Sequence, residues 1–369
     1  MSFNDEMARY SQFDFDGYFS SVTDSKIRSI LNKERINEND FLALLSPKAS
    51  SFIEEMARKA QDITKRQFGN VIFLFTPLYI SNICENVCSY CSFARQHKIS
   101  RRHLTVDQIK KEGIAIKNLG IRHILILTGE SRKVAGSEYL IKSVNALRDL
   151  FSSIAIEIYP MSGDEYGEMI ESGVDGLTIY QETYDKILYE KLHRGGPKED
   201  YLFRLNAPER ACKEGMRSIT LGPLLGLGEP RKEVFFSALH VSYLQNRYPW
   251  IETSISFPRI RPLAADFEPN FVVGDRSFVQ FMTASRIFLQ STGITISTRE
   301  SAEFRNAILP MGPTKMSAGV STSVGTQSES PSESQFEIAD KRSVQEMKKD
   351  LISMGYQPVM HDWNHSYTR

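Results

Sequence analysis

Short apolar, β-branched runs alternate with longer amphipathic stretches along most of this 369-residue chain. Most of the gaps between the runs can hold a helix, as at 106–119 and 139–150. Such alternation predicts a parallel sheet with helices outside it. Eight runs predict a closed (β/α)8 barrel of the TIM type, and a six-stranded open barrel is the alternative because the last two runs are short. The runs are 71–80, 123–127, 154–159, 176–180, 218–221, 253–257, 294–298 and 316–320.

The segments before and after these runs predict additions to the barrel, which would span 71–321. Residues 1–70 form an N-terminal helical extension, in which Ser46 is the N-cap of a helix that starts at Pro47 and packs outside the barrel. Residues 322–369 are expected to form a flexible loop, a helix opened by a capping box at 343–346, and a C-terminal tail.

Two parts of this C-terminal region have a second interpretation. The Ser- and Gly-rich stretch 321–334 is typical of a mobile loop, and it could order over the barrel mouth as a lid. The apolar tail at 355–363 is expected to dock on the barrel or on a partner, with Val359, Met360 and Trp363 as its exposed anchors.

Charge is balanced, because Lys plus Arg and Asp plus Glu both number 45. The chain therefore has no global field that would attract nucleic acid, acidic substrates or anionic membranes. No apolar run approaches 18 residues, and the polar start lacks the features of a signal peptide. These features predict a cytoplasmic enzyme that binds neither nucleic acid nor membrane.

Three of the four cysteines, Cys84, Cys88 and Cys91, lie within eight residues directly after the first run. Such tight spacing predicts that the three sulfurs converge on one site. Three thiolates can hold a [4Fe-4S] cluster and leave one iron open to another ligand. A structural zinc site would need a fourth ligand, for which His97 and His103 are candidates. Disulfides are not expected in a long chain with so few cysteines.

Polar residues follow the carboxyl ends of the predicted strands, where the active sites of such barrels lie. Arg299 follows the seventh run and offers a planar fork to a substrate carboxylate, unless it pairs with Glu300 or Glu303. Ser317 begins the eighth strand, and its hydroxyl could contact the same carboxylate or the substrate amine. Tyr90, between two of the clustered cysteines, must lie near them and could face the substrate.

Three further residues have a structural and a functional interpretation. Arg259 and Arg261 follow the sixth run and are either anion-binding residues or members of ion pairs. Cys212 lies before the fifth run, on the opposite end of the barrel, where a free cysteine usually behaves as a small buried hydrophobe.

The spacing of the three cysteines, with Tyr90 directly before the last, resembles the signature of the radical S-adenosylmethionine (SAM) superfamily. The resemblance implies that SAM chelates the open iron and that one electron cleaves it to methionine and a 5′-deoxyadenosyl radical. It also implies a set of residues that contact SAM. These are Phe93, Thr128, Gly129 and Glu130, of which the last three resemble a GGE-type motif for the methionine amino group, and Glu157 and Gln181 at the next two strand ends.

Ordered motifs over the whole chain resemble a narrower family, the 2-iminoacetate synthases of thiamine thiazole biosynthesis. The resemblance implies cleavage of the Cα–Cβ bond of L-tyrosine to 2-iminoacetate and p-cresol. It further implies transfer of 2-iminoacetate to thiazole synthase, and an electron donor of the flavodoxin or ferredoxin type. The motifs are 68–70, 77–84, 88–93, 128–130, 180–184, 256–262, 297–301 and 357–363.

Two related lyases share the catalytic core that this resemblance implies. The tyrosine lyase of [FeFe]-hydrogenase maturation has further C-terminal cysteines for a second cluster, whereas no cysteine follows Cys212 in this sequence. The tryptophan lyase that forms a methylindole acid differs mainly in its substrate pocket, so it remains the catalytic alternative. A noncatalytic partner of thiazole synthase is the alternative from another class.

Overall fold

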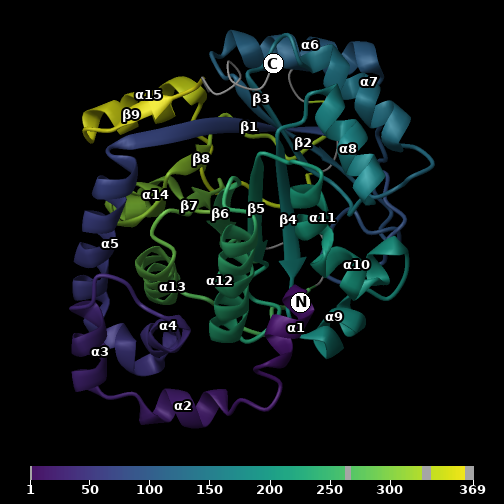
Figure 1. Ribbon diagram of the computed structural model, residues 1–369. Helices are drawn as coiled ribbons and strands as arrows, with labels where there is room; N and C mark the ends of the chain where they lie inside the picture. The colour runs from purple at the N-terminus through teal and green to yellow at the C-terminus, as the bar shows by residue number, and fades with distance from the viewer. Residues whose placement is uncertain (1, 262–266, 326–333, 362–369) are drawn as a thin grey trace.

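The computed structural model describes residues 2–261, 267–325 and 334–361. Eight parallel strands form a closed barrel in chain order, because β1 pairs with both β2 and β8 (Figure 1). The expected (β/α)8 barrel is thus confirmed, and each of the eight apolar runs is a strand. The strands are β1 Val71–Ser81, β2 His123–Thr128, β3 Ser153–Glu157, β4 Gly176–Glu182, β5 Ser218–Pro223, β6 Glu252–Ser256, β7 Gly293–Ile296 and β8 Lys315–Ser317.

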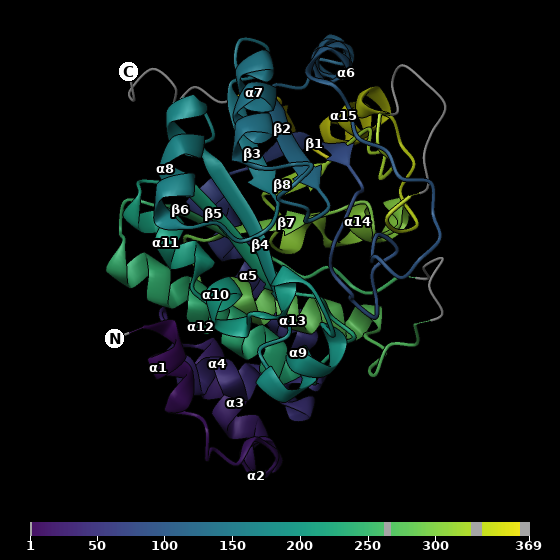
Figure 2. The same cartoon turned by 90° about the vertical axis from the view of Figure 1, so that its right-hand side faces the viewer.

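Helices cover the outside of the barrel between successive strands (Figures 1 and 2). Helix α6 shows why they form where they do: Thr105 and Gln108 make a capping box, and Ile109, Gly113 and Ile116 give it a buried face. The covering helices are α6 Val106–Asn118, α7 Ser137–Leu147, α8 Gly163–Ser172, α9 Lys186–Leu192, α10 Tyr201–Leu205, α11 Ala207–Lys213, α12 Pro230–Arg247, α13 Asp275–Phe288 and α14 Ala302–Ile308.

The N-terminal residues form helices that pack outside the barrel, as expected. The longest of them, α5, lies against α13 (Figure 1). Four shorter helices precede α5, and Phe3 on the first is almost fully buried. The five helices are α1 Phe3–Ala8, α2 Phe15–Ser21, α3 Asp24–Leu31, α4 Glu38–Leu45 and α5 Ile53–Phe68.

The continuous helix expected from Pro47 is divided in two. Residues Pro47–Phe52 form a 3-10 helix, capped by Ser46, and α5 begins only at Ile53. The side-chain amide of Gln280 on α13 donates to the carbonyls of Leu44 and Ser46, each over 2.8 Å. These tertiary hydrogen bonds hold the turn against the barrel, and a sequence pattern does not reveal them.

The C-terminal region adds a helix and a ninth strand. Ser343 and Glu346 form the expected capping box of α15 Val344–Ser353. Strand β9 Gln357–Val359 then pairs in parallel with residues 71–73 of β1, next to the start of β2. The tail therefore docks on the barrel itself, while Trp363 and most of the stretch 321–334 lie outside the described residues. Among the helices that the structure describes, none has the length and apolar character needed to cross a bilayer.

Candidate active site

The three clustered cysteines lie in the loop between β1 and α6, at the carboxyl mouth of the barrel. All three are free; Cys88 is buried, and Cys84 and Cys91 are partly buried. Burial raises the pKa of the Cys88 and Cys91 thiols above its usual value. A cationic ligand such as iron would reverse this effect, because it binds the thiolate form.

Backbone hydrogen bonds fix the cysteine loop against the segment that follows α9. The amide of Val87 donates to the carbonyl of Gly195 over 2.7 Å, and the amide of Arg194 donates to the carbonyl of Val87 over 3.0 Å. At Gly196 φ is 91°, and a Cβ there would lie 2.5 Å from Oδ1 of Asn86. Glycine is therefore required where this segment passes the cysteine loop.

The end of β2 approaches the same loop from the other side. A Cβ on Gly129 would lie 2.5 Å from the carbonyl oxygen of Ile83, so this position also needs glycine. Glu130 is buried, and Nδ2 of Asn86 donates to its Oε2 over 2.6 Å. The tripeptide 128–130 and the cysteine loop thus pack together as one unit.

A cavity of about 120 Å³ lies between the cysteine loop and the ends of β2, β3 and β4. Gln181 does not line it, because Tyr180 and Glu182 point to the interior face and the residue between them points away. The amide nitrogen of Gln181 is buried without a partner in the described part of the chain. The lining includes Cys84, Cys88 and Cys91 together with Phe93, Thr128, Gly129, Glu130 and Glu157.

A buried ionic cluster borders this cavity and was missed by the sequence analysis. Nζ of Lys198 lies 2.7 Å from Oε1 of Glu182, and a guanidinium nitrogen of Arg204 lies 3.5 Å from the same atom. Burial opposes ionisation of Glu182, but the two cations outweigh it and lower the pKa of this carboxyl. The sequence indicated only that Glu182 lies at a strand end, because its partners Lys198 and Arg204 are distant from it in the sequence.

Glu182 also has strained backbone geometry. Its φ of 71° makes it the one non-glycine residue with positive φ in the described ranges. The register of β4 against β5 shifts at this point, between Tyr180 and Glu182. Such strain persists only where the surroundings enforce it, and it is typical of functional sites.

A second cavity, of about 160 Å³, adjoins the first inside the barrel mouth. The two share lining residues, among them Tyr79, Glu157 and Tyr180. About half of the residues that line the second cavity are apolar or aromatic, and the others are polar or charged. Its polar lining includes the three residues that the sequence suggested for substrate contact, Tyr90, Arg299 and Ser317.

Arg299 is a cation without an anionic partner in this second cavity. Its Cζ lies 3.5 Å from the ring centroid of Phe336, and no carboxylate of the described residues forms an ion pair with it. Glu300 pairs instead with Arg259 and Arg261, so these two anion candidates are engaged in ion pairs. Burial lowers the pKa of Arg299. The guanidinium is therefore available to a carboxylate ligand.

Glu157 lies at the boundary of the two cavities. Burial raises the pKa of its carboxyl to about 7, and the nearby guanidinium of Arg299 offsets this rise only in part. A carboxyl group in this position can hold or release a proton close to neutral pH.

Tyr90 and Ser317 are held by neighbours in the same mouth. Nδ1 of His193 faces the carbonyl of Tyr189 at 2.8 Å, so Nδ1 carries the proton and Nε2 accepts from the Tyr90 hydroxyl, also at 2.8 Å. Oγ of Ser317 accepts a hydrogen bond from the backbone amide of Thr298 over 3.1 Å. No acceptor among the described residues takes the hydroxyl hydrogen of Ser317, so this group can also donate.

The cysteine loop fits a cluster better than a single metal ion. Among the residues that the structure describes, no three His, Cys, Asp or Glu side chains are grouped to hold one ion. A [4Fe-4S] cluster binds each thiolate through a different iron and so needs sulfurs that lie farther apart. Cys212 is buried on α11, as expected, and lines neither cavity. Three free thiols beside a cavity match a cluster with one open iron.

Comparison with known proteins agrees with this chemistry. Residues 78–236 match the family model of the radical SAM superfamily, and residues 256–357 match that of the biotin and thiamin synthesis associated domain. The chain is 36% identical to the 2-iminoacetate synthase of Escherichia coli over 96% of both chains. It is 34% identical to that of Salmonella typhimurium with the same coverage.

Solved structures show the same similarity. The crystal structure of HydG, a maturase of the [FeFe]-hydrogenase, superposes with a TM-score of 0.92 at 28% sequence identity. The alignment covers 100% of this chain and 82% of HydG.

Proposed function

The chain belongs to the 2-iminoacetate synthase family of radical SAM enzymes, and we propose that it acts in the two adjoining cavities of its barrel mouth. It is a carbon–carbon lyase that uses a [4Fe-4S] cluster and SAM to convert L-tyrosine to 2-iminoacetate and p-cresol, for thiamine biosynthesis. The whole-length similarity to 2-iminoacetate synthases carries this conclusion. Arg299, which forms no ion pair with a carboxylate of the described residues, lines the adjoining cavity and supports the location.

Cys84, Cys88 and Cys91 would hold the cluster through three of its irons. When bound, the cluster and SAM would supply the 5′-deoxyadenosyl radical chemistry of the reaction. The chain's own contribution is to orient both groups and to exclude water. The close approach of Gly129 and Gly196 to the loop supports this role, because it fixes the cysteines from two sides.

The smaller cavity would hold SAM. Glu130 is suited to the methionine ammonium group, because a buried carboxylate forms strong charge-assisted hydrogen bonds. Thr128, Gly129 and Phe93 would line the methionine part, and Glu157 a more distant part of the cofactor. Glu182 faces this cavity where Gln181 does not, so we add Glu182 to the proposed SAM contacts.

The larger cavity would hold tyrosine. Arg299 would bind the carboxylate in a bidentate manner, and the free hydroxyl hydrogen of Ser317 would reach the same group. Tyr90 would face the substrate from the cysteine loop. Deeper in the barrel the lining has several hydroxyls that could bind the phenol, at Thr178, Thr220 and Thr295. A site built around a substrate hydroxyl discriminates strongly against analogues that lack it.

Transfer of the product and supply of electrons complete the proposal. An imine hydrolyses readily in water, so direct transfer of 2-iminoacetate to thiazole synthase would protect it. A flavodoxin or ferredoxin type protein would reduce the cluster, and the reducing cytoplasm would suit its thiolates.

The test is anaerobic reconstitution with iron, sulfide, reductant and SAM, followed by product analysis. Tyrosine should give p-cresol and glyoxylate, the hydrolysis product of free 2-iminoacetate, in equal amounts. Phenylalanine should be a poor substrate. A methylindole product from tryptophan at a comparable or higher rate would instead identify a tryptophan lyase, and absence of SAM cleavage would favour a noncatalytic partner.

A further inference from the structure

The segment 334–342, which leads from the barrel mouth to α15, contributes two residues to the cavities. Gln335 lines both, and its Oε1 accepts a hydrogen bond from the hydroxyl of Tyr79 over 2.7 Å. Phe336 lines the larger cavity and lies against the guanidinium of Arg299. The position of this segment therefore determines the surroundings of Arg299.

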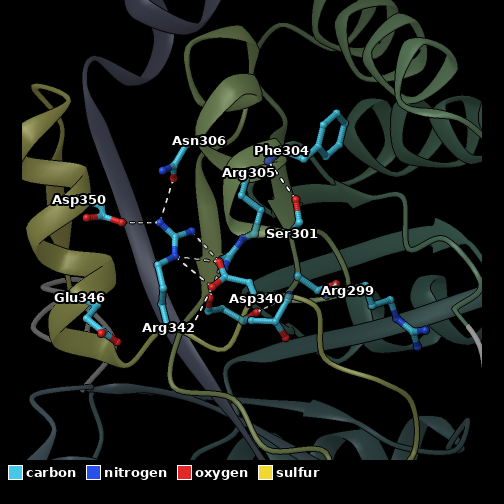
Figure 3. Close-up of polar contacts among 12 residues, drawn as sticks. Arg299, Ser301, Phe304, Arg305, Asn306, Asp340, Arg342, Glu346 and Asp350 are labelled. Carbon is cyan, nitrogen blue, oxygen red and sulfur yellow. Dashed lines mark hydrogen bonds and ion pairs between the residues drawn. The ribbon is translucent and has the colours of Figure 1, made fainter.

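A buried ion network holds this segment (Figure 3). Asp340 forms ion pairs with Arg305 of α14 and with Arg342, the latter at 2.6 Å. The side chains of Asp340 and Arg305 are each only 1% exposed, so water does not share in this interaction. Arg342 in turn reaches Asp350 of α15 over 2.7 Å. Two arginines and two aspartates thus balance one another between α14 and α15.

The network connects to the substrate-binding residues on the side of the barrel. A second guanidinium nitrogen of Arg305 donates to the carbonyl of Ser317 over 2.6 Å. The carbonyl of Thr298, the residue before Arg299, accepts from the amide of Ala339 over 2.9 Å. The amide of Thr298 donates to Oγ of Ser317. Both backbone groups of Thr298 are therefore fixed, one by the segment and one by Ser317.

We propose that Asp340 is a positioning residue for tyrosine binding. Through Arg305 and Arg342 it fastens the segment 334–342 to β8 and α14, and so holds Phe336, Thr298 and Ser317 in the arrangement that presents Arg299 to the substrate carboxylate. Figure 3 shows Arg299 directed away from the network, so Asp340 acts on it only through these neighbours. The inference rests on the proposed role of Arg299.

Water cannot take the place of the Asp340 carboxylate, because this side chain is buried. Without it, Arg305 would have no ion-pair partner among the described residues, and a buried guanidinium, which stays charged, must then move toward water. This movement would release the carbonyl of Ser317 or the segment beside Thr298. Asp350 differs, because its side chain is 40% exposed and water can take its place beside Arg342.

The first experiment compares Asp340→Asn with the control Asp350→Asn in the reconstituted holoenzyme. Asp340→Asn should raise the KM for tyrosine at least tenfold, and should leave the KM for SAM and the slow SAM cleavage without tyrosine within twofold. Asp350→Asn should change all three by less than twofold. An unchanged tyrosine KM in Asp340→Asn, or a parallel loss of the SAM parameters, would overturn the inference.

A double variant tests the inference if Asp340→Asn does not fold. The double variant Arg305→Met/Asp340→Leu removes both buried charges, a replacement that is often neutral for stability. It should show the same rise in tyrosine KM. A wild-type KM in this variant, or failure of both variants to fold, would assign the network to folding alone.

A third measurement does not depend on turnover. Phenylglyoxal modification of Arg299, mapped by peptide mass spectrometry, should be at least fivefold faster in Asp340→Asn than in the wild type. Faster modification with an unchanged tyrosine KM would refute the role of Arg299 in the proposed function while keeping its dependence on Asp340. An unchanged rate of modification would refute the positioning role of Asp340.

Discussion

Gly129 and Cys84 approach each other so closely that a Cβ on Gly129 would lie 3.1 Å from the Cβ of Cys84. Gly196 makes a similar approach on the other side of the loop, to Asn86. The positions of the cysteines are thus set by two glycines from distant parts of the barrel.

Gly196→Ala should reduce the iron content of the reconstituted protein severalfold, because the added Cβ would collide with Asn86 and displace the cysteine loop. Gly69→Ala is the matched control. Gly69 also has positive φ, 64°, but nothing lies within 4 Å of its Cβ position. The Gly69→Ala variant should lose about 1–3 kcal/mol of stability through backbone strain, and each folded molecule should keep the iron content of the wild type. Equal iron in both variants would contradict the prediction.

Alanine at Cys84, Cys88 or Cys91 should abolish both the cluster spectrum and SAM cleavage, since each thiolate would hold one iron. Cys212→Ala should keep the iron content of the wild type, because Cys212 is buried on α11 away from both cavities. Iron and sulfide analysis with Mössbauer spectroscopy is the measurement. Retention of a complete [4Fe-4S] cluster in any of the first three variants would exclude that cysteine as a ligand.

Arg299→Ala should weaken tyrosine binding by roughly 2–5 kcal/mol, the usual cost of removing one member of a buried charge pair. Slow SAM cleavage without tyrosine should persist, because the proposed SAM contacts are untouched. Arg261→Ala is the control: Arg261 lines the same cavity but is paired with Glu300 at 3.1 Å. A larger effect at Arg261 than at Arg299 would reverse the assignment of the carboxylate contact.

Glu157 should make the cofactor-free protein less stable as pH rises from about 4.5 to about 7. Its folded pKa of about 7 lies above the ordinary value of 4.5, so the unfolded chain loses this proton first. The contribution of the Glu157 carboxyl to the free energy of unfolding is therefore full below pH 4.5 and lost above pH 7. It amounts to about 3 kcal/mol at 1.36 kcal/mol per pKa unit. Glu157→Gln should flatten the curve of unfolding free energy against pH by this amount. An unchanged slope would place the Glu157 pKa near its ordinary value.

The sequence predicted the barrel because apolar, β-branched runs alternate with amphipathic stretches, a pattern that is visible without knowledge of tertiary contacts. It also predicted that Thr128, Glu157 and Arg299 share one mouth, since parallel strands end on the same side. It did not identify which side chain at the end of β4 faces inward: Tyr180 and Glu182 line the cavity, and Gln181 between them points away.

Ion pairs between residues far apart in the sequence could not be predicted either. Nothing in the order of residues shows that Asp340 meets Arg305, or that Lys198 meets Glu182, because each pair depends on how separate loops fold over the mouth. The contributions of Gln335 and Phe336 follow from the same long-range contacts. Functional residues carried by such segments become visible only with the tertiary structure.

The ninth strand bears on how this chain folds as it is synthesised. Residues 71–73 of β1 pair with β9 and residues 73–75 pair with β8, so closure of the barrel requires residues that emerge roughly 240 to 290 positions later. At about 5–20 residues per second, this interval is on the order of 15 to 60 s. Throughout it the N-terminal half of β1 has an unpaired edge, a site where other strands can add. Closure of the barrel is therefore a late event on the ribosome, and chaperone binding to nascent chains should be strongest before β8 and β9 emerge.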